Sequence, residues 1–89
     1  GIAEESSNDE ILDAILLLAK TEGIFTEPAG GVSVAVLKKM VDDGRIDRDE
    51  TTVCYVTGNG LKATESLMEV LPKPQLMQPD IAKISAVVK

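Results

Sequence analysis

The sequence predicts an α/β fold, a fragment of an open parallel sheet in which a strand–helix–strand unit is flanked by helices. Two short apolar segments, residues 24–26 and 52–56, have the composition of strands. Between them, apolar residues recur at helical spacing over residues 28–43. A strand, a helix and a second strand in this order form a right-handed parallel unit.

Composition restricts the class of protein. The 89 residues suffice for one small domain, and 44% of them are hydrophobic, almost all aliphatic. The net charge of −6 speaks against binding to nucleic acid or to an anionic membrane, since both attract basic patches. One cysteine and no histidine exclude an internal disulfide, most zinc sites and every Ser-His or Cys-His catalytic pair. We therefore expect no metal site, no nucleic acid and no membrane partner.

The expected location is cytoplasmic, or an organelle stroma if a transit peptide has been removed. The longest apolar run, residues 14–19, is too short to span a bilayer, and no signal peptide opens the chain.

A capping box predicts where the first helix begins. In Ser7-Asn8-Asp9-Glu10 a hydroxyl precedes a glutamate by three residues, directly before an apolar run. We expect this helix over about residues 8–21, with Gly23 after its end. Its apolar residues surround most of the helix, which should therefore be covered on several sides: Ile11, Leu12, Ala14, Ile15, Leu16, Leu17, Leu18 and Ala19.

The next elements form the strand–helix–strand unit. A short strand over residues 24–26 leads to Pro28, which is well tolerated in the first turn of a helix. This helix should run to about Asp43, before Gly44. A charged turn over residues 46–51 then leads into the strand at 52–56.

The C-terminal part is expected to be less compact. A third helix over about residues 62–71 is followed by a proline-containing connector, residues 72–80, and by a final edge strand over 81–88. Residues 1–71 are thus the C-terminal part of an α/β domain, and residues 72–89 are a connector with a terminal strand.

This plan is incomplete as a fold. Two short parallel strands do not make a self-sufficient sheet, because parallel sheets need both faces covered and unpaired edges invite association. The chain is therefore expected to be a piece of something larger, or a module that dimerises through its sheet.

Two motifs suggest a binding site. Thr57-Gly58-Asn59-Gly60 follows the strand at 52–56, and a hydroxyl with two glycines at the carboxyl end of a strand is typical of ligand sites in α/β sheets. The alternative is an ordinary turn, because Asn-Gly is a common turn dipeptide.

The second motif is Glu27-Pro28-Ala29-Gly30-Gly31. An acidic residue and a proline suit a helix start. The two glycines are unexpected there, because each costs about 1 kcal/mol relative to alanine in a helix. Something should pack closely against this helix end, either another part of the backbone or a ligand.

Three segments together resemble a known enzyme family. Ser7 to Leu12, the run Thr21-Glu22-Gly23-Ile24-Phe25-Thr26-Glu27-Pro28-Ala29-Gly30-Gly31, and Val53 to Lys62 are similar to the C-terminal part of the threonine synthase family. This family belongs to the tryptophan-synthase-β-like class of pyridoxal-phosphate enzymes. The resemblance covers roughly residues 5–70.

The resemblance implies specific roles. Thr57 would lie at the pyridine nitrogen of pyridoxal phosphate, and Glu27, Gly58, Asn59 and Gly60 would shape the pocket of the ring. The substrate in this family is O-phosphohomoserine, and the products are threonine and phosphate. The reactive lysine, the phosphate-binding loop and the substrate-phosphate ligands of the family belong to its N-terminal part and have no match here. We therefore expect no catalytic residue in this chain and no activity from the chain alone.

Two alternatives stay open at this point. The chain could derive from a related pyridoxal-phosphate-dependent threonine or serine dehydratase or other β-eliminating enzyme, a distinction that depends on threonine rather than serine at position 57. It could also be a free-standing α/β binding module that acts as a homodimer.

Overall fold

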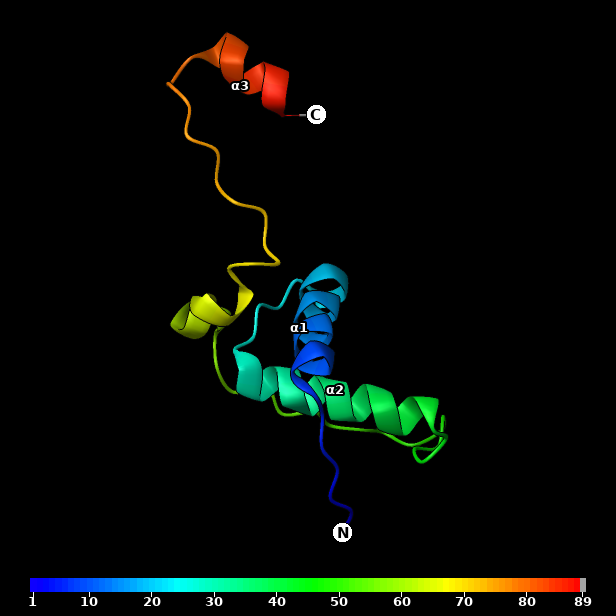
Figure 1. Ribbon diagram of the computed structural model, residues 1–89. Coiled ribbons are helices and arrows are strands. Elements are labelled where there is room, and N and C mark those ends of the chain that lie inside the picture. The colour runs from blue at the N-terminus through cyan, green and yellow to red at the C-terminus, as the bar shows by residue number, and fades with distance from the viewer. Residues whose placement is uncertain (89) are drawn as a thin grey trace.

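The structure, a computed structural model, describes residues 1–88 and contains four helical segments. These are α1 (Asn8–Glu22), α2 (Pro28–Asp42), the 3-10 segment η1 (Gly60–Leu67) and α3 (Ile81–Val87). Figure 1 shows α1 crossing α2, with η1 beside the N-terminal end of α2 and α3 far from the rest. None of the helices in this part of the chain is long and apolar enough to cross a membrane.

The first helix begins and ends as predicted. The Ser7 hydroxyl accepts a hydrogen bond from the Glu10 amide at 3.2 Å, and the Ser7 amide donates to the Glu10 carboxylate at 2.7 Å. These reciprocal bonds are the predicted capping box. At the other end, Gly23 has a φ of 67°, which glycine adopts without steric cost, and its amide donates to the Ala19 carbonyl.

The crossing of α1 and α2 forms a small core. Ala14 and Ile15 of α1 and Ala35 of α2 are buried there. Gly31 lies at the crossing, where an added Cβ would come within 2.7 Å of the Ile15 side chain and 3.1 Å of the Ile11 carbonyl oxygen. The close approach of the two helices thus accounts for a glycine that helix propensity alone disfavours.

The predicted parallel strands do not form within residues 1–88. Instead, Thr26 and Asn59 make one isolated antiparallel bridge. Residues 52–56 are extended but pair with no other segment of the described chain. A strand is defined by its partner, and the local sequence could not supply one. The α/β prediction is therefore not confirmed for this piece, which is helical.

The predicted edge strand over residues 81–88 is wrong. Residues 81–87 form the helix α3, and Asp80 caps it by accepting hydrogen bonds from the Ala82 and Lys83 amides. An aspartate directly before a run of helix-compatible residues is a start signal that outweighed the β-branched residues of the segment. Lys89, the last residue of the predicted segment, lies outside the described residues.

The helix predicted over residues 62–71 is shorter and begins earlier. Segment η1 starts at Gly60 because the Asn59 side chain accepts a hydrogen bond from the Leu61 amide, so the second half of the predicted turn acts as a helix cap. Ala63 interrupts it with a φ of −145°. The fully buried Leu67 anchors the segment to the body.

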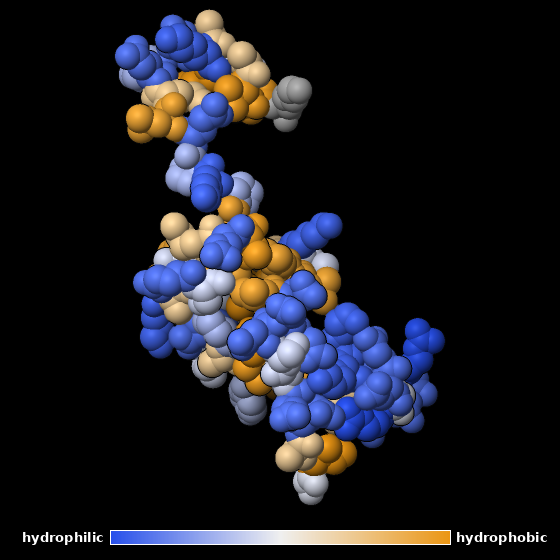
Figure 2. Space-filling view, in the orientation of Figure 1, coloured by the Kyte–Doolittle hydropathy of each residue, from blue (hydrophilic) through white to orange (hydrophobic). Residues whose placement is uncertain are grey.

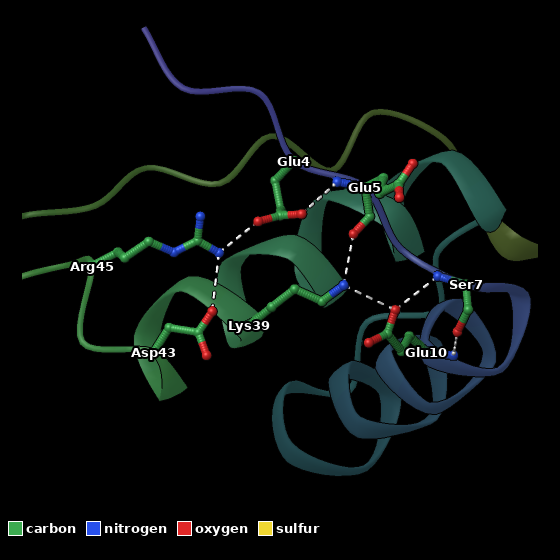
Figure 3. Close-up of polar contacts among 7 residues, drawn as sticks. All are labelled: Glu4, Glu5, Ser7, Glu10, Lys39, Asp43 and Arg45. Carbon is green, nitrogen blue, oxygen red and sulfur yellow. Dashed lines mark hydrogen bonds and ion pairs between the residues drawn. The ribbon is translucent and has the colours of Figure 1, made fainter.

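Ion pairs fasten the N-terminal segment, residues 1–7, across α2 (Figure 3). The Arg45 guanidinium contacts the Glu4 carboxylate at 2.6 Å and Asp43 at 3.1 Å. Lys39 donates to the Glu5 carbonyl at 2.8 Å and pairs with Glu10 at 3.2 Å. This network fixes the direction in which the chain approaches α1.

Much of the hydrophobic surface is left uncovered. Leu16, Leu17 and Ile24 are exposed on and just after α1, contrary to the expected cover on several sides. Figure 2 shows hydrophobic side chains on the surface of the main body and on the distant α3. With an extent of 56 × 26 × 20 Å, the molecule is long for its 89 residues.

Candidate functional site

The two motifs singled out from the sequence lie against each other. The Glu27 amide donates to the Gly58 carbonyl at 3.1 Å, and the Gly60 amide donates to the Phe25 carbonyl at 2.9 Å. These two bonds surround the Thr26–Asn59 bridge. The start of α2 and the turn at 57–60 therefore form one unit, which we call the turn clamp (residues 25–27 and 57–60).

Thr26 lies at the centre of the turn clamp, although the sequence gave no reason to single it out. Its side chain is 0% exposed. Its hydroxyl is within 3.1 Å of the Glu27 carbonyl and 3.2 Å of the Gly58 carbonyl, so one proton is shared between two acceptors.

Glu27 packs on the turn with its side chain as well as its backbone. A Cβ on Gly58 would overlap the Glu27 carboxylate, which shows how closely the two residues approach. The carboxylate is 18% exposed and pairs with the Lys62 ammonium at 3.4 Å. A larger residue at position 58 would thus have to displace the Glu27 side chain, and the negative charge of Glu27 has a partner within this chain.

The other glycines of the motifs also face protein atoms. A Cβ on Gly30 would overlap the Thr26 hydroxyl, and one on Gly60 would lie 2.5 Å from the Phe25 ring. Of the two explanations left open for Gly30-Gly31, close packing within the chain accounts for both residues, because Gly31 lies at the α1–α2 crossing.

Thr57 differs from its neighbours in being free. It is exposed, and its hydroxyl makes no hydrogen bond with any residue from 1 to 88. The Asn59 side chain, by contrast, already accepts a hydrogen bond from the Leu61 amide at 2.9 Å. The turn clamp therefore presents one hydroxyl that can donate or accept a hydrogen bond to a group outside this chain.

Two cavities in the part of the chain that the structure describes lie away from the turn clamp. One of about 400 Å³ lies between α1 and α2 and is lined mainly by charged residues such as Glu10 and Lys39. A second of about 350 Å³ lies between α2 and residues 52–55. Neither is lined by Glu27 or by the turn at 57–60.

Comparison with known proteins shows which protein family the chain belongs to. Residues 1–58 match the sequence pattern of the family described as pyridoxal-phosphate dependent enzyme, and the chain belongs to this family. The cofactor of the family is pyridoxal phosphate.

Three relatives of the chain are named threonine synthase. The chain is 42% identical over 89 residues to the threonine synthase of Methanocaldococcus jannaschii, a match that covers all of this chain and 22% of that protein. It is 45% identical over 84 residues to the threonine synthase of Methanosarcina acetivorans, covering 94% of this chain and 21% of that protein. The threonine synthase of Mycobacterium tuberculosis is 48% identical over 67 residues, or 75% of this chain and 19% of that protein. The chain spans about a fifth of the length of these relatives.

The turn clamp fits one part of the cofactor. The uncommitted Thr57 hydroxyl suits the pyridine nitrogen, because it can either donate or accept a hydrogen bond there. The Glu27 carboxylate is paired with Lys62, so it would not place an unbalanced negative charge beside the ring. No residue of the turn clamp suits the phosphate or the aldehyde of the cofactor.

Proposed function

We propose that this chain is the C-terminal part of a threonine synthase, which converts O-phosphohomoserine to threonine and phosphate. In that enzyme it forms the wall around the pyridine ring of pyridoxal phosphate. The observation that carries the proposal is the turn clamp, in which the Gly58 carbonyl accepts two hydrogen bonds and the Thr57 hydroxyl has no partner among residues 1–88. The identity to three threonine synthases supports the choice of reaction.

The proposed role of the Thr57 hydroxyl is to form a hydrogen bond with the ring nitrogen without keeping that nitrogen protonated. When bound, pyridoxal phosphate supplies an electron sink for the reaction. An acidic residue beside the nitrogen would keep it protonated and strengthen that sink, whereas a neutral hydroxyl only forms a hydrogen bond. A tempered sink suits an enzyme that must choose between competing eliminations.

The remainder of the enzyme is the proposed partner, and residues 52–56 are the proposed contact. Val53 is 73% and Tyr55 78% exposed, while Cys54 and Val56 are half-buried, and a Cβ on Gly30 of α2 would lie 3.2 Å from the Val56 side chain. Alternation of this kind is what a strand shows when one face is covered and the other is not. We propose that this segment joins the parallel sheet of the full-length enzyme, where its backbone finds partners and Val53 and Tyr55 are covered.

The chain alone is proposed to be inactive, since the family resemblance places the lysine that anchors the cofactor in the N-terminal part of the enzyme. Lys62 is exposed and pairs with Glu27. The 89-residue chain mixed with pyridoxal phosphate and dialysed should therefore retain no visible absorbance band. A band that survives dialysis would contradict the proposed division of the site.

The reaction itself is tested on the full-length enzyme. Purified protein supplied with O-phosphohomoserine should release threonine and phosphate in equal amounts. The related dehydratase reaction is tested in a parallel assay supplied with threonine or serine, from which a dehydratase would release ammonia and a 2-oxo acid. Release of those products without threonine formation would assign the chain to a dehydratase.

A further inference from the structure

We infer that Thr26 is the positioning residue that fixes the turn at 57–60 and so directs the Thr57 hydroxyl toward the cofactor. This inference rests on the proposed function. It concerns a residue that touches neither cofactor nor substrate and acts through Gly58.

The first step of the argument is that the turn needs an external support. Gly58 has no Cβ, so its own φ and ψ are weakly restricted, and the direction of its carbonyl must be set by the bonds that the carbonyl accepts. It accepts two, from the Glu27 amide at 3.1 Å and from the Thr26 hydroxyl at 3.2 Å. Thr57 is bonded directly to Gly58, so whatever fixes Gly58 also limits the orientation of Thr57.

The second step is that the Thr26 hydroxyl is confined to this role. The residue is completely buried, and among residues 1–88 its hydroxyl has only the Glu27 and Gly58 carbonyls as acceptors. A buried hydroxyl without an acceptor is destabilising, because its hydrogen bonds to water have been lost and none replaces them. The hydroxyl of Thr26 is therefore expected to stay hydrogen-bonded.

The third step concerns the space around Thr26. A Cβ on Gly30 would overlap the Thr26 hydroxyl and would lie 3.2 Å from the Val56 side chain. The first turn of α2 therefore leaves a space at Gly30 that the Thr26 side chain fills. This packing joins three segments, 25–27, the start of α2 and 56–58, so the hydroxyl bridges positions 32 residues apart in the sequence.

The test compares three variants of the full-length enzyme. Thr26→Val keeps the branched shape and removes the hydroxyl, whereas Thr26→Ser keeps the hydroxyl and removes the methyl group. Thr21→Val is the matched control, because the Thr21 hydroxyl also donates to a backbone carbonyl, that of Leu17, but from the exposed surface of α1. For each variant we would measure the dissociation constant of pyridoxal phosphate, the visible spectrum of the bound cofactor, and the unfolding midpoint of the cofactor-free protein.

Thr26→Val should weaken cofactor binding about fivefold to tenfold, the effect of one lost hydrogen bond, and should alter the visible spectrum. Thr26→Ser and Thr21→Val should stay within about twofold of the wild type and keep its spectrum. If Thr26→Val does not fold, Thr26→Cys is compared with Thr26→Ser, since both lack the methyl group and the thiol is the weaker donor; Thr26→Cys should show a smaller loss of the same kind.

The inference is overturned if Thr26→Val, or Thr26→Cys in its place, binds the cofactor with wild-type affinity and spectrum. It is also overturned if Thr26→Ser loses as much affinity as Thr26→Val, since packing of the methyl group would then be the role of Thr26. Failure of the proposed function is a separate result, in which the wild-type enzyme itself binds no pyridoxal phosphate or forms no threonine.

Discussion

At the scale of single residues, Gly58 shows how side-chain packing determines a site. A Cβ at this position would overlap the Glu27 carboxylate, so a larger residue fits only if the Glu27 side chain moves. Glycine in this turn was expected for its backbone freedom or for the approach of a ligand. The structure gives a different reason, which is contact with a residue of the other motif.

Substituting Gly58 with alanine should therefore displace Glu27. We expect Gly58→Ala to destabilise the full-length enzyme by about 1–3 kcal/mol, as overpacking typically does, and to weaken pyridoxal-phosphate binding. Chemical unfolding and cofactor titration measure the two effects. In a Glu27→Ala background the same substitution should cost clearly less, because the carboxylate is gone. Equal costs in both backgrounds would show that the contact with Glu27 is not the reason for glycine.

Substitution of Thr57 tests the proposed role of its hydroxyl directly. Thr57→Val removes the free hydroxyl at an exposed position, so stability in the absence of cofactor should change by less than about 0.5 kcal/mol. Cofactor affinity should fall about tenfold, since the ring nitrogen loses its hydrogen bond. Thr57→Ser should retain the affinity. An unchanged affinity in Thr57→Val would remove this residue from the site.

At the scale of elements, the N-terminal segment should detach in acid. The pKa of Glu10 is lowered from its ordinary value of 4.5 chiefly by the hydrogen bond from the Ser7 amide, and then by the bond from Lys39. The pKa of Glu4 is lowered chiefly by the Glu5 amide, and then by Arg45. Lowered values mean that these carboxylates stabilise the segment above pH 4.5 and lose that effect as the pH falls through their folded pKa values.

Carbon-detected NMR titration of the two carboxylates checks this expectation. Arg45→Ala should raise the pKa of Glu4 toward 4.5 and leave that of Glu10 lowered. Lys39→Ala should chiefly raise the pKa of Glu10. Each variant serves as the control for the other. A pKa of 4.5 or above for both carboxylates in the unsubstituted chain would show that the network does not form in solution.

The segment at 52–56 gives the corresponding test for the missing sheet. Its backbone pairs with nothing in residues 1–88, so its amides should exchange with solvent almost freely in the 89-residue chain. In the full-length enzyme the same amides should be strongly protected by neighbouring strands. The buried residues Ala14 and Ile15 of α1 should be the more protected reference in the short chain. Free exchange of 52–56 in both proteins would refute the proposed strand.

Local signals predicted the elements whose bonds are local. The capping box at Ser7, the left-handed Gly23 and the proline at the start of α2 all describe contacts within four residues, and all three are confirmed. Strand pairing depends on partners that are distant in the sequence. The composition of residues 24–26 and 52–56 predicts strands but does not indicate what these strands pair with. The strand predicted over residues 81–88 is a helix over residues 81–87, because the Asp80 side chain caps the amides of Ala82 and Lys83.

At the scale of the whole molecule, the sequence singled out two motifs, and the structure brings them into contact. The cofactor role of these residues stays a prediction. Thr26 was missed because a single buried threonine has no sequence signature. The chain spans about a fifth of the length of its relatives. We propose that the rest of the enzyme covers the apolar surface that α1 and α3 expose.

The most direct test of this account is the crystal structure of the full-length enzyme with pyridoxal phosphate bound. We predict that the Thr57 hydroxyl oxygen lies within hydrogen-bond distance of the pyridine nitrogen, about 2.7–3.2 Å, and that the Thr26 hydroxyl still donates to the Gly58 carbonyl. A different side chain at the ring nitrogen, with the turn at 57–60 away from the cofactor, would contradict the account.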